Sequence, residues 1–198
     1  MIILPVNNSI QNSVSYILHS QDVDYCILID CGEYNVLASE IAKIQKTVKY
    51  VFLTHGHFDH ICGLNQLIQY YPDCLIFTTD YGHRELHNPR KNLSIFQGKA
   101  FTICSYKASI LRGGEQLKFT GFPEIEVIAT PGHDASCLSY KVDNALFTGD
   151  SYIPGLKVFS KFPSGNKEIA MKSWECLDNL SHNGYDVFCG HHDYLAKK

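Results

Sequence analysis

Three histidines and one aspartate are crowded into one short stretch of this chain. The segment from His55 to His60 reads HGHFDH and directly follows an apolar run. Imidazole and carboxylate groups are the usual ligands of zinc, iron and manganese, and a two-metal site needs about three to four protein donors per metal. In a tight turn, His55 and His57 can face one metal while Asp59 and His60 face another. We therefore interpret the segment as part of a metal centre rather than as a histidine-rich surface loop.

Three more metal-capable side chains follow other apolar runs, each after a glycine-containing turn. They are His133 in Thr-Pro-Gly-His, Asp150 in Thr-Gly-Asp and His191 in Cys-Gly-His. Rigid strands that deliver polar groups into loops at one edge are a common way to build an active site. We therefore expect these three residues to join the cluster between His55 and His60.

The elements that position these donors are predicted from the pattern of apolar residues. Runs rich in β-branched and aromatic residues between turn residues indicate strands at Ser13–Leu18, Cys26–Asp30, Val48–Thr54, Leu75–Thr78, Glu124–Thr130, Cys137–Val142, Ala145–Thr148 and Asp186–Cys189. Apolar residues at helical spacing indicate helices at Val36–Ile44, Leu64–Tyr71 and Glu168–Leu180. Val142 to Ala145 is typical of a hairpin turn. Leu93–Gly121 gives no firm assignment, because its glycines break the pattern.

Length and composition are those of one ordinary globular domain. The chain has 198 residues, of which 45% are hydrophobic and 19% charged, so it can bury a sizeable core and is not disordered. We predict a single domain over residues 1–198. The formal net charge of -3 does not supply the broad positive field that nucleic-acid binding needs.

The sequence also bears on location. Its N-terminus lacks the basic segment, apolar core and cleavage site of a secretory signal, and no apolar run reaches the roughly 18 residues of a membrane span. The eight cysteines are scattered singly, without a Cys-x-x-Cys pair. We interpret them as reduced core cysteines and expect a cytoplasmic protein with neither a membrane nor a nucleic-acid partner.

Together with two upstream segments, the metal-capable motifs resemble the metallo-β-lactamase superfamily. The upstream segments are Asn12-Ser-Val-Ser-Tyr-Ile-Leu and Leu28-Ile-Asp-Cys-Gly, so the resemblance covers nearly the whole chain. It implies an α/β fold, the αβ/βα sandwich of that superfamily. In this fold two mixed β-sheets lie face to face, helices flank them, and the metals lie at one edge.

The resemblance also implies a ligand set for two divalent metal ions, with zinc expected and iron or manganese as alternatives. The set consists of His55, His57 and His133 for the first metal, Asp59, His60 and His191 for the second, and Asp150 as the bridge. Between two such cations a water loses a proton near neutral pH, and the bridging hydroxide attacks a carbonyl group that the metals polarise. Asp59 is therefore expected to be essential for catalysis.

Residues beside these ligands are interpreted from their positions. Asp30 is expected to orient the histidine loop by hydrogen bonds, with a strand-end turn aspartate as the alternative. His192 follows His191, but successive side chains of an extended segment point to opposite sides, so only one faces the metals. Asp134 stands where relatives often have threonine, and it places negative charge near the metals. Cys137 is expected to be a buried cysteine at the start of a strand.

Other polar residues are weaker candidates. His83 and His87 are four apart on a possible short helix, a spacing that can bind a metal, but the family pattern is complete without them. Basic residues in segments that could overhang the site are either solvated charges or contacts for a substrate carboxylate. They are Arg84, Arg90, Lys91, Lys157 and Lys161. No residue is singled out as substrate-binding.

Within the superfamily, the short length and the Thr-Gly-Asp150 step resemble small glyoxalase II-like thioesterases, which act on acyl-glutathione thioesters. We therefore expect a metal-dependent hydrolase that cleaves a thioester or ester of a small molecule. The segment after Asp150 lacks the Gly-Arg-x-Asp step of many such proteins, so a lactonase or other small-ester hydrolase is an alternative. Two further alternatives are a persulfide dioxygenase with a single iron and a metal-binding module without catalytic activity. The substrate, the native metal and the oligomeric state are left open.

Overall fold

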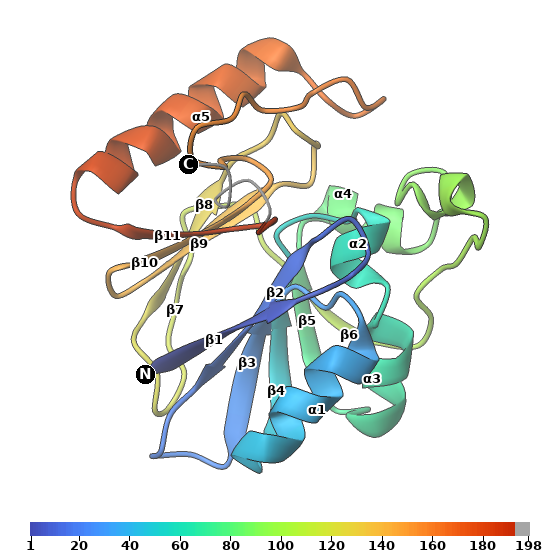
Figure 1. Ribbon diagram of the computed structural model, residues 1–198, viewed down its shortest axis with the longest axis vertical. Coiled ribbons are helices and arrows are strands. Elements are labelled where there is room, and N and C mark those ends of the chain that lie inside the picture. Colours follow the sequence, from blue (N-terminus) through green and yellow to red (C-terminus); the bar gives the residue numbers. More distant parts are fainter. Residues whose placement is uncertain (193–198) are drawn as a thin grey trace.

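Two mixed β-sheets lie face to face in this protein, whose computed structural model describes residues 1–192 (Figure 1). The first sheet has the strand order β1-β2-β3-β4-β5-β6, with strands β1 (Ile2–Asn7), β2 (Val14–His19), β3 (Tyr25–Ile29), β4 (Thr47–Phe52), β5 (Leu75–Thr78) and β6 (Lys107–Ile110). The second has the order β11-β10-β9-β8-β7, with β7 (Gln116–Leu117), β8 (Ile125–Ala129), β9 (Leu138–Val142), β10 (Ala145–Gly149) and β11 (Asp186–Cys189). The last six residues of the domain predicted over 1–198 lie outside the described residues.

Both sheets combine parallel and antiparallel pairs. In the first, β1, β2 and β3 pair antiparallel, whereas β3 to β6 pair parallel. In the second, only the β10–β11 pair is parallel among the described strands. The carboxyl ends of β4, β10 and β11 therefore reach loops at one edge of the sandwich, where an active site can be assembled.

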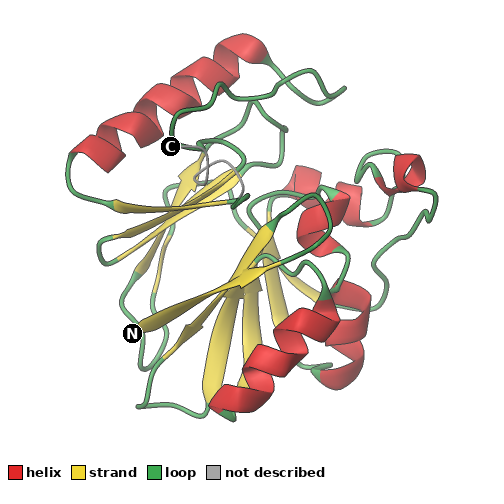
Figure 2. Cartoon of the chain, viewed as in Figure 1, coloured by secondary structure: helices red, strands yellow, loops and turns green. Residues whose placement is uncertain are grey.

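Helices cover the outer faces of both sheets (Figure 2). They are α1 (Tyr34–Ile44), α2 (Phe58–Ile61), α3 (Leu64–Tyr70), α4 (Asp80–Leu86), the 3-10 helix η1 (Ser94–Gln97) and α5 (Lys167–His182). Helices α1 and α3 lie on the first sheet, and α5 lies along the second. This is the α/β sandwich of two mixed sheets that the sequence predicted.

The apolar residues form three layers that match this arrangement. The central layer lies between the sheets and includes the fully buried rings of Phe52, Tyr140 and Phe147. A second layer joins the first sheet to α1 and α3, and a third, smaller one joins Leu146 to Leu177 on α5. Because strands such as β3 are buried along their whole length, they read as continuous apolar runs.

The predicted elements agree with the structure within one or two residues at their ends. The bounds of β5 and β11 coincide with the predicted strands, and the hairpin turn between β9 and β10 is confirmed by the pairing of Val142 with Ala145. Strands β1, β6 and β7 and helix α2 were missed. Strand β1 is largely exposed and contains Pro5, β6 is mostly exposed, and β7 has only two residues, so none shows a clear apolar period.

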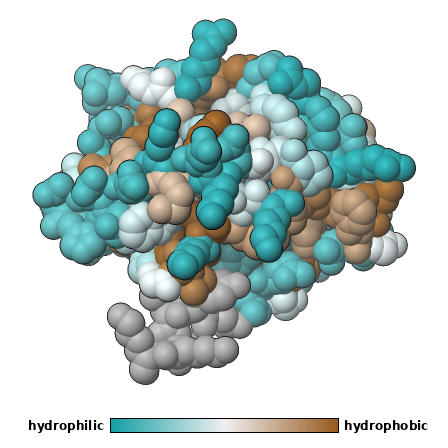
Figure 3. All heavy atoms as spheres, turned by 90° about the horizontal axis from the view of Figure 1, so that it is seen from above, coloured by the Kyte–Doolittle hydropathy of each residue, from teal (hydrophilic) through white to brown (hydrophobic). Residues whose placement is uncertain are grey.

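The outer surface is mixed in character. Seen from above, hydrophilic side chains are interspersed with smaller hydrophobic patches (Figure 3). Ile169 and Met171 on α5 are among the exposed hydrophobic residues. No helix within residues 1–192 is both long and apolar enough to cross a bilayer.

Candidate metal centre

The loops that follow β4, β8, β10 and β11 bring seven metal-capable side chains to one place. Their donor atoms form three overlapping groups, each with all atoms within 4.8 Å of one another. The members are His55, His57, Asp59, His60, His133, Asp150 and His191. The structure thus gathers every residue that the sequence had proposed as a ligand, from loops of both sheets.

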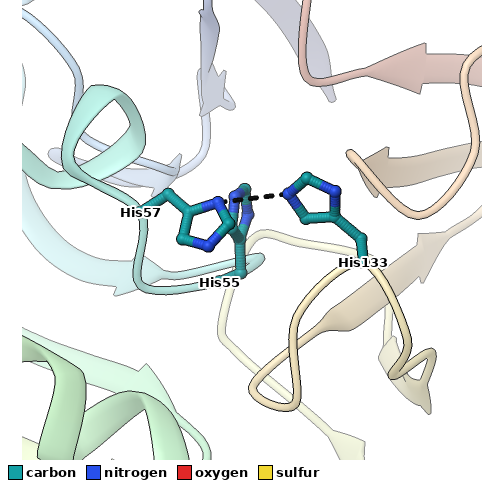
Figure 4. A group of neighbouring side chains, drawn as sticks. All are labelled: His55, His57 and His133. Carbon is teal, nitrogen blue, oxygen red and sulfur yellow. Dashed lines mark hydrogen bonds between the residues drawn. The ribbon is translucent and has the colours of Figure 1, made fainter. Parts of the chain in front are cut away.

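The first group consists of His55, His57 and His133, whose rings converge from two loops (Figure 4). Nδ1 of His57 lies 3.1 Å from Nε2 of His133, and the ring centroids of His55 and His57 are 4.5 Å apart. Two imidazole nitrogens bound tetrahedrally to one zinc ion would be about 3.3 Å apart, given the usual metal–nitrogen distance. The spacing therefore fits a shared cation.

The second group consists of Asp59, His60 and His191. Oδ2 of Asp59 lies 3.6 Å from Nε2 of His60 and 3.7 Å from Nε2 of His191. Asp59 and His60 lie on α2, a single helical turn, instead of on the tight turn that the sequence predicted. The consecutive residues of this turn present a carboxylate and an imidazole to the same group.

Asp150 lies between the two groups. Its Oδ1 is 3.4 Å from Nε2 of His60, while its Oδ2 is 3.1 Å from Nε2 of His191 and 3.4 Å from Nε2 of His133. One carboxylate therefore faces donors of both groups. This is the geometry that a bridging ligand requires.

Buried donor atoms without hydrogen-bond partners support cation binding at this centre. Nε2 of His55, Nε2 of His60 and Oδ1 of Asp150 are buried and make no hydrogen bond among the described residues. Leaving such polar atoms unsatisfied is costly in a folded protein. A cation between them would satisfy all three, so the donor set fits divalent metal ions.

The charges of His55 and of the shared carboxylate Asp150 agree with that fit. Burial, together with the neighbouring His60 and His57, holds the pKa of His55 well below its usual value, so this imidazole is neutral and can donate a lone pair. Burial alone would raise the pKa of Asp150, but His60 and His191 hold it well below its ordinary value, so it is a carboxylate. A neutral imidazole and an ionised carboxylate are the forms that bind metals.

Asp30 supports the second group from behind. It directly follows β3 and has a left-handed backbone, φ 59°. Its Oδ1 accepts a hydrogen bond from the backbone of Thr54 at 2.7 Å, and its Oδ2 lies 2.8 Å from Nδ1 of His60. This contact turns Nε2 of His60 toward the donor group, as expected for a residue that orients a ligand.

The other ring nitrogens of two more histidines are held by backbone carbonyls. His133 Nδ1 lies 2.7 Å from the carbonyl oxygen of Phe159, and His191 Nδ1 lies 2.8 Å from that of Gln11. Since each ring has only two nitrogens, these contacts fix which one faces the centre. The loops that contain Phe159 and Gln11 are thereby tied to the site.

Asp134 lies behind His57 and not in the open cleft. Its side chain is fully buried, and its Oδ2 is 3.5 Å from Nε2 of His57. Its Oδ1 accepts hydrogen bonds from the backbone and hydroxyl of Ser136, and its Oδ2 accepts one from Ser164. The sequence correctly placed this negative charge near the donors, but its hydrogen bonds hold it in the protein interior.

Glu85 is a buried carboxyl group that sequence reasoning missed. It lies on α4, is inaccessible to solvent, and neither carboxyl oxygen has a hydrogen-bond partner among the described residues. A Cβ added to Gly56 would lie 2.4 Å from Oε2 of Glu85, so the carboxyl packs against the glycine between His55 and His57. Burial and the nearby Asp134 raise its pKa to about 9. The sequence of α4, DYGHREL, gave no signal for this burial, because polar residues predominate in it.

The remaining histidine candidates lie apart from the three donor groups. His83 Nδ1 and His87 Nε2 instead approach the hydroxyl of Tyr106, at 2.7 Å and 3.3 Å. The backbone N–H of His192 donates to the carbonyl of Asn12. Cys137 is buried, as expected, and burial holds its pKa well above the usual thiol value.

The other cysteines and the basic candidate residues differ in their exposure and in their distance from the donor groups. Cys104 and Cys176 are exposed, so the interpretation of all cysteines as core residues was wrong for these two. Arg84 pairs with Asp80 on the exposed side of α4. Lys157 and Lys161, in contrast, line two clefts that open at the donor groups.

These two clefts share four lining residues. The larger has a volume of about 610 Å³ and the smaller about 120 Å³, and both are lined by His133, Asp150, Phe159 and His191. The larger volume is within the usual range of small-molecule sites. A substrate in either cleft would lie directly against the donor side chains.

A protein-family model described as Metallo-beta-lactamase superfamily matches residues 10–192 of this chain. Among curated proteins, the hydroxyacylglutathione hydrolase of Francisella philomiragia subsp. philomiragia is 30% identical over 148 residues, which are 74% of this chain and 49% of that protein. The hydroxyacylglutathione hydrolase of Erwinia tasmaniensis is 27% identical over 175 residues, 88% of this chain and 60% of that protein. The chain spans only about half to three fifths of the length of these relatives.

Solved structures share the architecture. BLEG-1 B3 metallo-beta-lactamase superposes with a TM-score of 0.85 at 21% identity, covering 96% of this chain and 92% of that one. TTHA1623 in a di-iron-bound form superposes with a TM-score of 0.78 at 20% sequence identity, covering 96% of this chain and 92% of that one. ETHE1 from Myxococcus xanthus superposes with a TM-score of 0.72 at 20% sequence identity, covering 97% of this chain and 76% of that one. At these identities the likeness establishes a common fold and no more.

Proposed function

Because the chain belongs to the metallo-β-lactamase superfamily, we propose that it is a hydrolase that uses two divalent metal ions, zinc first among them, to cleave a thioester or ester of a small molecule. The curated relatives are named hydroxyacylglutathione hydrolase, which supports a thioester as the substrate. The di-iron form of the structural neighbour supports a two-metal centre.

The observation that carries this proposal is the presence of two donor groups that share one carboxylate. His55, His57 and His133 would hold the first metal, and the group of Asp59 would hold the second. Asp150 faces both groups within 3.4 Å. A site for a single iron would need neither the complete second group nor a shared carboxylate.

When bound, a metal pair supplies an acidified water as nucleophile and polarises the carbonyl under attack. The protein's own part is to hold the donors rigidly and to shield the site. Asp30 and the carbonyl of Phe159 fix the orientation of His60 and His133. The ring of Phe162 packs edge-on against His57 at 4.7 Å and places an apolar surface beside the first group. No serine or cysteine nucleophile is required.

The first test is the metal content of the protein as purified without added metal, measured by elemental mass spectrometry. We expect close to two zinc or manganese ions per chain, together with turnover of at least one member of a panel of thioesters, lactones and simple esters. About one iron per chain, with oxygen uptake on addition of a persulfide, would contradict the hydrolase. Full metal content without turnover of any ester would instead indicate a non-catalytic module.

A further inference from the structure

We propose that the substrate carries an aromatic or bulky apolar acyl group, and that this group lies between Phe96 on one wall of the larger cleft and Phe159 with Phe162 on the other. This inference rests on the proposed hydrolysis of a thioester or ester, because it names the acyl side of that substrate. It predicts that the protein prefers such an acyl group over a small hydroxyacyl group.

One wall is an aromatic pair attached to the metal centre. The rings of Phe159 and Phe162 are 4.9 Å apart, and the ring of Phe162 lies 5.4 Å from that of His133. The carbonyl of Phe159 is the hydrogen-bond partner of His133 Nδ1 at 2.7 Å. The segment is therefore fixed at the donors, and its apolar surface begins beside His133.

A second part of the lining comes from α2, from η1 and from the residue that precedes η1. Phe58, Leu93 and Phe96 line the larger cleft there, together with the neutral Gln97. Phe96 is 72% exposed and Phe159 is 53% exposed, although both are large apolar side chains. Exposed aromatic surface at the mouth of a cleft is typical of a binding site, because a ligand placed between the rings buries it.

Charge in the cleft is sparse apart from the proposed metal ligands. Lys161 is the one other ionisable side chain among the described residues that line it. The cleft therefore offers at most one cation for an anionic end of the substrate and binds mainly by apolar contact. A hydroxyacyl group would find Gln11 and Gln97 as its hydrogen-bonding side chains outside the metal centre.

The test measures binding separately from turnover. Isothermal titration of the metal-loaded protein compares the S-phenethyl and S-2-hydroxypropyl thioethers of N-acetylcysteamine, neither of which can be hydrolysed. We expect the phenethyl compound to bind at least tenfold more tightly. In Phe96→Ala and Phe159→Ala this preference should fall below threefold. Phe159→Ala keeps the backbone carbonyl that holds His133.

Ile95→Ala is the matched control, since Ile95 is an exposed apolar residue of the same 3-10 helix and is not among the residues lining the cleft. We expect it to keep the full preference for the phenethyl compound. Equal or weaker binding of the phenethyl compound by the unmodified protein would overturn the proposal. So would a tenfold preference that survives in both phenylalanine variants.

Turnover separates this inference from the function on which it rests. The phenylacetyl and 2-hydroxypropanoyl thioesters of N-acetylcysteamine are assayed in parallel, and kcat/KM should favour the phenylacetyl thioester at least tenfold. Hydrolysis of both thioesters at equal rates would overturn the acyl preference while the hydrolase stands. Preferential phenethyl binding with no hydrolysis of any ester would overturn the hydrolase and leave the aromatic binding site in place.

Discussion

At the scale of single residues, Asp30 connects the first sheet to the donors. Its carboxylate contacts His60 at 2.8 Å and Thr54 at 2.7 Å. It therefore fixes the orientation of the proposed ligand His60 and the position of Thr54, where the histidine loop begins. We expect Asp30→Asn to weaken metal binding at the second group by about 10- to 100-fold, as is usual when a partner of a ligand is lost. Competition with a chelator of known affinity measures the change, and unchanged affinity would contradict the role.

Asparagine is the suitable replacement because the position has a positive φ, which asparagine tolerates better than alanine. Asp24→Asn is the control, since Asp24 is an exposed aspartate near the opposite end of β3. It should leave the chelator competition unchanged.

Asp59 gives the sharpest test of the two-metal proposal. Asp59→Ala removes a carboxylate from the second group while leaving His55, His57 and His133 in place. We expect the metal content to fall from about two to about one per chain and ester hydrolysis to be lost, with an unchanged far-ultraviolet circular dichroism spectrum. Full activity in this variant would contradict the two-metal mechanism.

Glu85 predicts a pH effect on stability. Its folded-state pKa is raised to about 9 by burial and by Asp134, whereas in an unfolded chain it ionises near pH 4.5. Between these values the unfolded state releases a proton that the folded state keeps. The contribution of the neutral Glu85 side chain to the free energy of unfolding is therefore fully present below pH 4.5 and is lost as pH rises to 9. Glu85→Gln cannot ionise, so its stability relative to the parent should rise by up to about 1.4 kcal/mol per pH unit across that window.

Urea unfolding at pH 5, 7 and 9, at constant metal content, measures this difference. Glu175→Gln, an exposed position on α5, is the matched control and should show no such trend. A constant difference between Glu85→Gln and the parent at all three pH values would show that Glu85 is ionised in the folded protein.

The proposed ligands were accessible from the sequence because they sit in short ordered motifs at strand ends. His55 to His60 are neighbours in the chain, and each of the other three follows a glycine turn. The carboxyl group of Glu85 was not accessible, because its contact with Gly56 joins residues far apart in the chain and depends on how α4 packs. The place of Asp134 was likewise settled only by three-dimensional contacts with His57 and the two serines.

At the scale of elements, the junction between β10 and β11 controls the position of Asp150. The backbone N–H of Gly190 donates to the carbonyl of Gly149 at 2.8 Å, which brings the two strand ends together. A Cβ at Gly190 would lie 2.2 Å from Oδ1 of Asp150 and 2.9 Å from Cε1 of His60. We expect Gly190→Ala to displace this carboxylate and to lower metal content, measured by elemental mass spectrometry, with little loss of secondary structure.

Gly184→Asn is its control, because Gly184 lies in open space with a positive φ that asparagine tolerates. Metal content should stay at the parental level in this variant. Retention of both metals in Gly190→Ala would mean that Asp150 can move without loss of the centre.

Element prediction succeeded where burial imposes a pattern and failed where it does not. The central strands and α5 were found because their apolar residues repeat at regular spacing or form buried runs. Strand β6 and η1 lie in the unassigned stretch Leu93–Gly121, and β6 has a largely exposed sequence that gives no period. Phe96, which carries the acyl-group inference, lies in that same stretch, so the cleft could not be described from sequence.

At the scale of the whole molecule, the donor groups join the two sheets. Four donors follow β4 of the first sheet, whereas His133, Asp150 and His191 follow strands of the second. Metal bound between them stabilises only the folded chain, by about 2.7 kcal/mol when free metal is at 100 times its Kd. For a chain of this size, that corresponds to roughly 5–10 °C in Tm.

We therefore expect chelation with EDTA to lower the Tm by this amount, and added zinc to restore it, in differential scanning calorimetry. Asp59→Ala should show a smaller shift, because one of the two groups has lost a ligand. If elemental analysis confirms that the metal has been removed and the Tm is unchanged, the two sheets hold the donors in place without bound metal.

The position of β11 as the last described strand of the chain also sets the order in which the donor groups are completed during synthesis. The ribosome completes β1 to β6 by residue 110, whereas His191 emerges some eighty residues later. Strands β8 to β10, which bury the inner face of the first sheet, are complete by residue 149, about forty residues before His191. The second donor group is incomplete at that stage, so its metal can bind with all three donors only after the apolar layer between the sheets has been synthesised. The two sheets can therefore pack together by apolar burial before a metal in the second donor group contributes to stability.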